Sequence, residues 1–341
     1  MEPTDKQRTG RWVLLSLSVL ALLLAAGWLW WQFQPVGQGS LRLVKVEPGM
    51  NARQIGQKLQ RQGIIRRAWA FEWVVRVKGW SGRLQPGTYE LRPSMSPLQI
   101  ARLIAEGQVA TSWVTIPEGY TVRQIAALMQ ERGIADREEF LRLATQEGDT
   151  FSASFPLPKN LEGYLFPNTY RLPRGTGARA AIQNMISLLE REVYQKYRAE
   201  IEQSGFTFHQ ILTIASMIER EAKVSQDRPL ISAVIRNRLQ RDMKLEIDAT
   251  VLYALGTHKS RVLYRDLEVD SDYNTYRRKG LPPGPIANPG LACIEAALRP
   301  AQVDYLYYVA RPDGSHIFTR TLHEHRVAIA RARAERARAT P

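Results

Sequence analysis

The sequence predicts a mixed α+β chain in which one apolar helix precedes two related strand-and-helix modules and a larger helical part. Three observations lead to this fold class. Residues 12–32 form an apolar run, residues 45–65 recur in altered form at 115–135, and residues 206–222 have the periodicity of a helix. With 341 residues, 44% of them hydrophobic, the chain is long enough for about two folded units with cores.

The apolar run near the amino terminus has the length of a membrane-spanning helix. No charged residue lies between Arg11 and Arg42, and about 20 apolar residues suffice to cross the hydrocarbon core of a bilayer. Tryptophans lie at both ends of the run, as in aromatic belts, and basic residues precede it. A signal peptide cleaved after small residues is the alternative. We expect a cytoplasmic tail, a single span and a polar spacer, at residues 1–11, 12–32 and 33–41.

Beyond the spacer, two stretches align at an offset of 70 residues. KVEPGMNARQIGQKLQRQGII at 45–65 matches TIPEGYTVRQIAALMQERGIA at 115–135. Each copy predicts a strand, a glycine-containing turn and an amphipathic helix that ends at a glycine. A second match, between residues 84–91 and 165–172, predicts a turn and a strand in each copy. We expect two small α+β modules that either bind a ligand or only pack.

The stretch FTFHQILTIASMIEREA at 206–222 predicts the helix on which the chemistry depends. Thr207 and the glutamine three residues later form a capping box, and apolar residues follow at helical spacing. Glu219 and Glu221 then fall on the two borders of the apolar face, while Arg220 points away from it. Partial desolvation of a carboxyl at such a border raises its pKa, as a general acid requires. Two ordinary boundary glutamates paired with nearby cations are the simpler alternative.

A second helix is expected to follow, beginning near Ser225 or Asp227 with Pro229 in its first turn. Two helices joined by a short loop pack as a hairpin, so we expect Glu219 at the mouth of the groove between them. The rest of the pattern predicts a helix, a β-hairpin and a basic tail, at residues 289–298, 305–319 and 331–341.

Five polar residues that follow the two-helix hairpin in sequence are candidates for contacts with a carbohydrate. Asp248 and Thr250 follow the second helix closely enough to approach the groove. Tyr273, Asn274 and Tyr276 lie in a stretch crowded with Pro, Gly and aromatic residues, which predicts an ordered loop. Their hydroxyl, amide and ring groups suit a sugar, and a loop that merely packs on its tyrosines is the alternative.

Charge and composition narrow the function further. The net charge of +14 favours an anionic neighbourhood such as nucleic acid, phospholipid headgroups or a cell-wall polymer. The sequence contains no phosphate-loop or zinc-finger spacing that would favour nucleotides or nucleic acid. His323 and His325 lack the spacing of a zinc pair on a helix, and the lone Cys293 lacks a nearby base. We therefore expect no metal and no cofactor.

Five motifs in one order closely resemble the endolytic murein transglycosylase family, the YceG-like proteins of bacterial inner membranes: LEGYLFPNTY, ASMIEREA, LEIDATVLYALG, DYNTY and GLPPGPIANPG. The resemblance implies a LysM-like module at 42–110 and a catalytic domain at 111–330 in the periplasm. It implies cleavage of nascent peptidoglycan strands between N-acetylmuramic acid and N-acetylglucosamine, leaving a 1,6-anhydromuramoyl end. It also suggests peptidoglycan synthases as partners, and no nucleic acid.

Within these motifs the resemblance assigns the catalytic role to Glu219, and we expect Glu221 to support it. One carboxyl is enough for a transglycosylase, because the C6 hydroxyl of the substrate replaces the water that a hydrolase activates. Asn168 stands where the family usually has aspartate, so only a turn-forming role is expected there.

Three other functions stay open at this point. A membrane-anchored scaffold would bind peptidoglycan without cutting it. A tethered nucleic-acid binder would account for the positive charge and would bind in a strongly salt-dependent way. An ordinary muramidase would cut the same strands with water and leave reducing ends.

Overall fold

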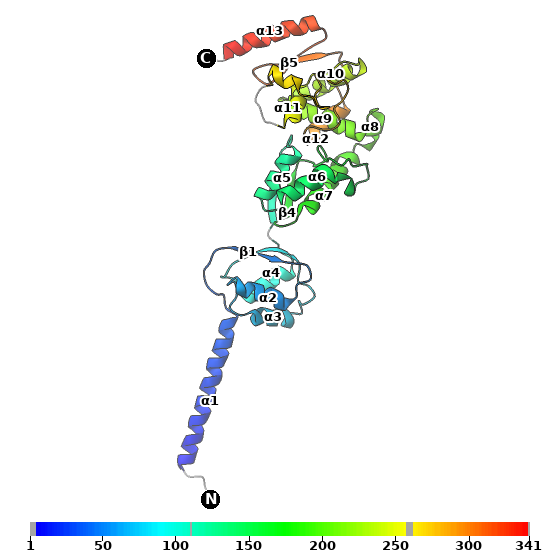
Figure 1. Cartoon of the computed structure of the whole chain (residues 1–341). Helices are drawn as coiled ribbons and strands as arrows, with labels where there is room; N and C mark the ends of the chain where they lie inside the picture. Colours follow the sequence, from blue (N-terminus) through cyan, green and yellow to red (C-terminus); the bar gives the residue numbers. More distant parts are fainter. Residues whose placement is uncertain (1–4, 110, 257–261, 340–341) are drawn as a thin grey trace. The chain divides into compact units, whose positions relative to one another are not determined.

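The computed structural model describes residues 5–109, 111–256 and 262–339 (Figure 1). Helices predominate, and the described strands form two-stranded sheets that pair β1 with β2, β3 with β4 and β5 with β6. The mixed α+β class predicted from the sequence is confirmed.

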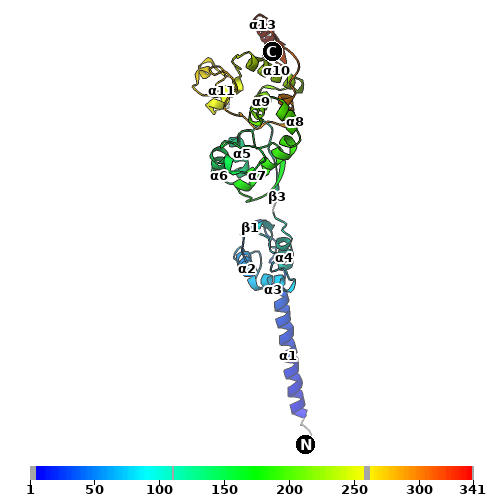
Figure 2. The ribbon, with the colours of Figure 1, turned by 90° about the vertical axis from the view of Figure 1, so that its right-hand side faces the viewer.

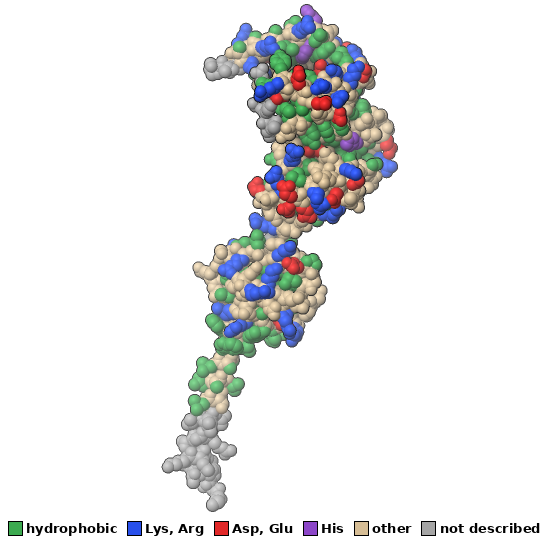
Figure 3. Space-filling model, in the orientation of Figure 1, with side chains coloured by type: hydrophobic (Ala, Val, Ile, Leu, Met, Phe, Trp, Pro, Cys, Tyr) green, Lys and Arg blue, Asp and Glu red, His purple; other side chains and the backbone are tan. Residues whose placement is uncertain are grey.

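Two compact units make up the chain. The first comprises Met1–Ser112 and Pro173–Gly175, and the second comprises Trp113–Leu172 and Thr176–Pro341. Each unit has a hydrophobic cluster of its own. In residues 42–109 of the first unit, 12 Lys and Arg residues stand against four Glu, and Figure 3 shows more blue than red side chains there. The first unit is therefore cationic.

The chain starts with α1 (Asp5–Gln32), which contains the predicted span. Residues 1–4 of the predicted tail and all side chains before Ser16 lie outside the described part. Beyond that point leucines and tryptophans of α1 are exposed, with Leu22 at 70%. Within the described residues, no helix combines the length and the apolar character that crossing a membrane needs. The structure thus confirms a helix over residues 12–32 but not a membrane span.

The first unit contains the first copy of the repeated module. β1 (Arg42–Val46) pairs antiparallel with β2 (Gly87–Leu91) and places Val44 opposite Tyr89. Asn51 begins the first helix with a capping box, as its local sequence requires. One apolar cluster joins the sheet to three helices, α2 (Ala52–Arg61), α3 (Ala68–Val77) and α4 (Pro97–Ala105).

The second copy repeats this order of elements. A capping box at Thr121 starts its first helix, just as Asn51 does in the first copy. The duplication predicted from the sequence is therefore confirmed as a repeated fold. Its elements are β3 (Thr111–Thr115), α5 (Val122–Glu131), α6 (Arg137–Gln146), a 3-10 turn (Gly148–Thr150), β4 (Thr169–Pro173) and α7 (Ala178–Leu189).

The second unit continues with the predicted helical part. α9 (Phe208–Glu221) packs against α10 (Arg228–Gln240), α11 (Asp248–Leu255) and α12 (Leu291–Leu298), so it lies inside the unit (Figure 2). The predicted β-hairpin is also present, and the described part of the predicted basic tail is the end of a helix that begins at Leu322. The remaining elements are a π-helical turn (Glu190–Tyr194), α8 (Arg198–Gln203), 3-10 turns (Ser225–Asp227 and Tyr264–Glu268), β5 (Tyr307–Ala310), β6 (His316–Thr319) and α13 (Leu322–Ala339).

Candidate active site

The last turn of α9 presents Glu219, Arg220 and Glu221 in different directions. Every residue from Ile211 to Ile218 is buried, which fixes the helix in the core. Glu219 and Glu221 are half-buried and Arg220 is exposed, as the periodicity predicted. The helix ends because Ala222 turns to an extended conformation.

Glu219 lies against the amino terminus of α12. Its Oε2 accepts a hydrogen bond of 2.9 Å from the backbone N–H of Gly290, the residue that precedes α12. Its Cγ lies 3.5 Å from the place where a Cβ on Gly119 would be. The sequence predicted a position between α9 and α10, whereas the structure places Glu219 between α12 and the glycine turn of the second copy. The difference arises because the loop before α12 brings Gly290 to the end of α9.

A second carboxyl, that of Glu118, meets Glu219 at the same glycine. A Cβ on Gly290 would overlap the Glu118 carboxyl, so a side chain at this position would force that carboxyl to move. Partial burial and the charge of Glu219 raise the pKa of Glu118, while Arg228 opposes this shift. Burial, followed by the Glu219 charge, raises the pKa of the Cys293 thiol. Burial and the neighbouring charge of Glu219 therefore favour the protonated form of the Glu118 carboxyl.

Glu221, on the other border of α9, belongs to a separate polar cluster. The Tyr308 hydroxyl donates to Glu221 Oε2 at 3.2 Å, and the backbone N–H of Ala249 also donates to this carboxyl. Burial, followed by the nearby charge of Asp248, raises the pKa of Glu221 to about 7. The Tyr276 hydroxyl donates to Asp248 Oδ1 at 2.6 Å. The structure thus joins Glu221 to two of the predicted sugar contacts.

The other predicted sugar contacts make hydrogen bonds or ring contacts within the protein. The Thr250 hydroxyl donates to the carbonyl of Ile247, and the Asn274 amide donates to two loop carbonyls. Both side chains are fully buried, so neither offers a polar group to a sugar. The sequence could not reveal this, because the loop backbone needed these donors for itself. Tyr273 is half-buried and packs its ring against Tyr253, with centroids 4.9 Å apart.

Asn168 has the turn-forming role expected of it. Its Oδ1 accepts a hydrogen bond of 2.6 Å from the N–H of Thr169, the first residue of β4. Its carbonyl accepts another from the N–H of Ile116. An uncharged amide suffices for both contacts.

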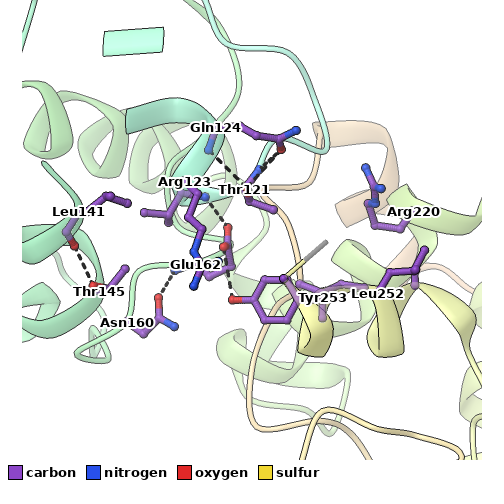
Figure 4. Close-up of a pocket in the computed structure, with 14 residues that line it drawn as sticks. Thr121, Arg123, Gln124, Leu141, Thr145, Asn160, Glu162, Arg220, Leu252 and Tyr253 are labelled. Atoms are coloured by element: carbon purple, nitrogen blue, oxygen red, sulfur yellow. Dashed lines mark hydrogen bonds between the residues drawn. The ribbon is translucent and has the colours of Figure 1, made fainter. Parts of the chain in front are cut away.

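A cavity of about 570 Å³ lies beside α9 within the second unit (Figure 4). We call it the Glu162 cavity, after the only carboxyl-bearing residue among the described residues that line it. Arg220 from α9, Arg123 from α5 and Tyr253 from α11 all reach it. The complete lining is Thr121, Val122, Arg123, Gln124, Leu141, Thr145, Asn160, Glu162, Arg220, Ala249, Leu252, Tyr253, Gly256 and Ile286.

Glu162 is held from several sides. Its Oε1 accepts hydrogen bonds of 3.0 Å from the Val122 N–H and from the Asn288 amide, and the Tyr253 hydroxyl lies 3.3 Å from Oε2. Burial raises the pKa of Glu162 to about 8, although these hydrogen bonds and the charge of Arg123 oppose the shift. Glu162 is therefore mostly uncharged at neutral pH.

Sequence reasoning assigned no role to Glu118 or Glu162. One signal for Glu118 was present, since it stands in the second copy where the first copy has Pro48. Glu162 lies within the motif LEGYLFPNTY, but nothing in the sequence distinguished it from the other residues of that motif. Among the described residues, no group of three or more His, Cys, Asp or Glu side chains is placed to hold a metal ion.

Comparison with known proteins agrees with the resemblance found in the sequence. Residues 44–331 match the model of the YceG-like family. An endolytic murein transglycosylase of Bacillus subtilis (strain 168) is 38% identical over 314 residues, which cover 86% of each chain. One from Streptococcus pneumoniae serotype 2 is 32% identical over 335 residues, 87% of this chain and 60% of the relative.

A solved structure is also similar. A crystal structure of a YceG-like protein from Listeria monocytogenes is 37% identical, with a TM-score of 0.58, over 85% of this chain and 99% of that one. The family match covers most of the chain, and the relatives named above share about a third of its residues or more. The chain therefore belongs to the YceG-like family.

Proposed function

We propose that this chain is a membrane-anchored endolytic transglycosylase that cleaves nascent peptidoglycan strands. Its relatives share the name endolytic murein transglycosylase, which supports the enzyme class of lytic transglycosylases. The single observation that carries the proposal is the place of Glu219. This half-buried carboxyl is held by Gly290 at 2.9 Å, next to a second carboxyl.

The reaction needs one proton donor that can later accept a proton. Glu219 protonates the glycosidic oxygen as the bond from that oxygen to C1 of N-acetylmuramic acid breaks. The C6 hydroxyl of the same sugar then attacks C1, and its proton returns to Glu219. Intramolecular attack needs no water, and holding the two groups in place contributes several kcal/mol to the rate. The product is a 1,6-anhydromuramoyl end.

Glu118 and Gly290 support this role of Glu219. The N–H of Gly290 orients the Glu219 carboxyl, and Glu118 lies close by as a neighbour whose own pKa is raised by burial and by the charge of Glu219. Glu221 is the alternative candidate for the general acid, because its pKa of about 7 suits proton transfer at neutral pH. We assign Glu221 an orienting role, because its carboxyl already accepts hydrogen bonds from the Tyr308 hydroxyl and the Ala249 N–H.

The first unit is proposed to keep the enzyme at its substrate. Its exposed apolar helix α1 is proposed as an inner-membrane anchor, because leucines and tryptophans exposed along one helix need an apolar cover. The cationic module that follows α1 in sequence is proposed as a LysM-like glycan-binding module close to the membrane. Its positive charge would be attracted there by anionic headgroups and by cell-wall polymer. Peptidoglycan synthases are the proposed partners of the periplasmic part.

Mass spectrometry of cleaved strands tests the function. Wild type, Glu219→Gln and Glu221→Gln are incubated with nascent glycan strands, and the new ends are identified. We expect anhydro ends from the wild type, almost none from Glu219→Gln, and anhydro ends from Glu221→Gln at a reduced rate. Strands that bind but stay intact would favour the scaffold. Loss of cleavage in Glu221→Gln with activity retained in Glu219→Gln would reverse the assignment of the acid.

A further inference from the structure

The Glu162 cavity adjoins the catalytic carboxyl but contains none of the residues assigned to catalysis. Glu219 and Arg220 meet the second copy at the same turn. A Cβ on Gly119 would lie 3.5 Å from Glu219 Cγ and 3.9 Å from Arg220 Nη1. Thr121, two residues further, already lines the cavity. A substrate that reaches Glu219 therefore has this cavity beside it.

Two arginines line the cavity without a close ion pair among the described residues. Neither Arg123 nor Arg220 has a carboxylate within 4.0 Å in the part of the chain that the structure describes. The matching arginine of the first copy, Arg53, does have one: its Nε lies 3.6 Å from Glu72. Among the described residues, the second copy thus lacks the close ion pair that the first copy makes at this position.

The cavity's own carboxyl does not compensate these charges. Oε1 of Glu162 is engaged by Val122 and Asn288, and with its pKa near 8 the group is mostly uncharged at neutral pH. In Figure 4 the side chain of Arg123 runs alongside Glu162, and Arg220 lies across the cavity from Thr145. The cavity is therefore electropositive.

The rest of the lining suits a short peptide. Leu141, Leu252 and Ile286 provide apolar surface, and Gln124 and Asn160 provide amides. A volume of about 570 Å³ lies in the range of small-ligand sites. Guanidinium groups bind carboxylates through strong charge-assisted hydrogen bonds, often two at a time.

We propose that the Glu162 cavity binds a carboxylate of the peptide branch that a peptidoglycan strand carries, with Arg123 and Arg220 as its ligands. This inference rests on the proposed function, because it names a part of the same substrate. The cavity would then position a branched strand so that a neighbouring glycosidic bond meets Glu219. Strands that lack the branch would lose this contact.

Three forms of one strand test the proposal: bare strands, strands with acidic peptide branches, and strands whose branch carboxylates are amidated. We expect the wild type to cleave the acidic form with a kcat/KM about tenfold above that of the other two, the effect of one charge-assisted hydrogen bond. Arg123→Gln and Arg220→Gln should each bring this ratio close to one. Arg198→Gln is the control, because it changes an exposed arginine of α8 that pairs with Glu202 outside the cavity, and it should keep the wild-type ratio.

Equal cleavage of all three forms by the wild type would overturn the proposal, as would a ratio that neither cavity variant changes. Binding is measured separately by calorimetry, with Glu219→Gln protein and a disaccharide that carries the acidic peptide. Weaker binding after the further change Arg123→Gln supports the cavity even if no strand is cut. A failure to cut any strand would count against the transglycosylase alone. Equal affinity for the acidic and the amidated disaccharide would refute the cavity's role.

Discussion

The two copies of the repeated module share their backbone but differ in what their glycine turns meet. A Cβ added to Gly49 in the first copy would find nothing within 4 Å, whereas Gly119 in the second copy lies against Glu219 and Arg220. The repeated fold therefore does not itself supply the chemistry. The turn of the second copy lies against Glu219 because α9 and α12 belong to the same unit and pack beside it.

The largest expected effect concerns Glu162, which has no carboxyl counterpart in the first copy, where Ser81 stands. Its pKa rises from 4.5 to about 8 on folding, so its stabilising contribution is complete below pH 4.5 and is lost as pH rises through 8. Glu162→Gln keeps the shape of the uncharged side chain but cannot ionise, so its stability should not fall with pH for this reason. At about 1.4 kcal/mol per pH unit, wild type should lose up to about 5 kcal/mol of unfolding free energy relative to Glu162→Gln.

Urea unfolding of both proteins at a series of pH values between 4.5 and 8 measures this difference. Other groups that titrate in this range, Glu221 among them, are present in both proteins and cancel. A difference that stays constant with pH would show that Glu162 is ionised in the folded protein.

The next effect concerns catalysis where the second copy meets α9. Glu219→Gln removes the proton but keeps the hydrogen-bonding shape, so kcat should fall about 10²–10⁴-fold. The unfolding free energy should change little, which circular dichroism with urea can verify. Glu221→Gln is the control from the same helix turn, and we expect its kcat to fall by less than about tenfold. Equal losses in both variants would mean that the two borders of α9 act together.

The glycine turns provide a matched pair of variants. Gly119 and Gly49 have φ values of +75° and +82°, so alanine at either position should cost about 1–2 kcal/mol of stability. Only Gly119→Ala places a methyl group against Glu219, so only this variant should also lower kcat. Thermal unfolding measures the loss of stability in both variants, and strand cleavage measures kcat in both. If Gly49→Ala lowered kcat as strongly, the contrast between the copies would fail.

The smallest effect concerns the capping boxes, where the copies should agree. Thr121 and Asn51 each accept a hydrogen bond from the backbone N–H of the third helical residue. Alanine at either position should lower the unfolding free energy by about 1 kcal/mol. Urea unfolding followed by circular dichroism measures both values. Values that differ by several kcal/mol would show that one cap carries a further role.

Local signals explain which parts of this fold could be predicted. The capping box at Thr207, the apolar spacing of α9 and the two borders occupied by Glu219 and Glu221 depend on residues a few positions apart. The duplication was visible for the same reason, because each copy repeats its own turn and cap. Such features need no knowledge of distant contacts.

The parts that were missed depend on distant contacts. Glu118 and Glu219 are about a hundred residues apart in sequence and meet at Gly290, while Asn288 reaches back 126 residues to Glu162. Asn274 was expected to bind sugar because its amide suits that task. The folded loop uses the amide for its own carbonyls.

In the proposed reaction, Glu219 directs attack by the sugar's own C6 hydroxyl. Cleavage in water enriched in oxygen-18 tests it most directly, because hydrolysis incorporates an oxygen from water and intramolecular attack does not. We predict that wild type yields new ends without the heavy isotope and that Glu219→Gln yields almost no new ends. Heavy oxygen in most of the new ends would show that water, and not the C6 hydroxyl, is the nucleophile.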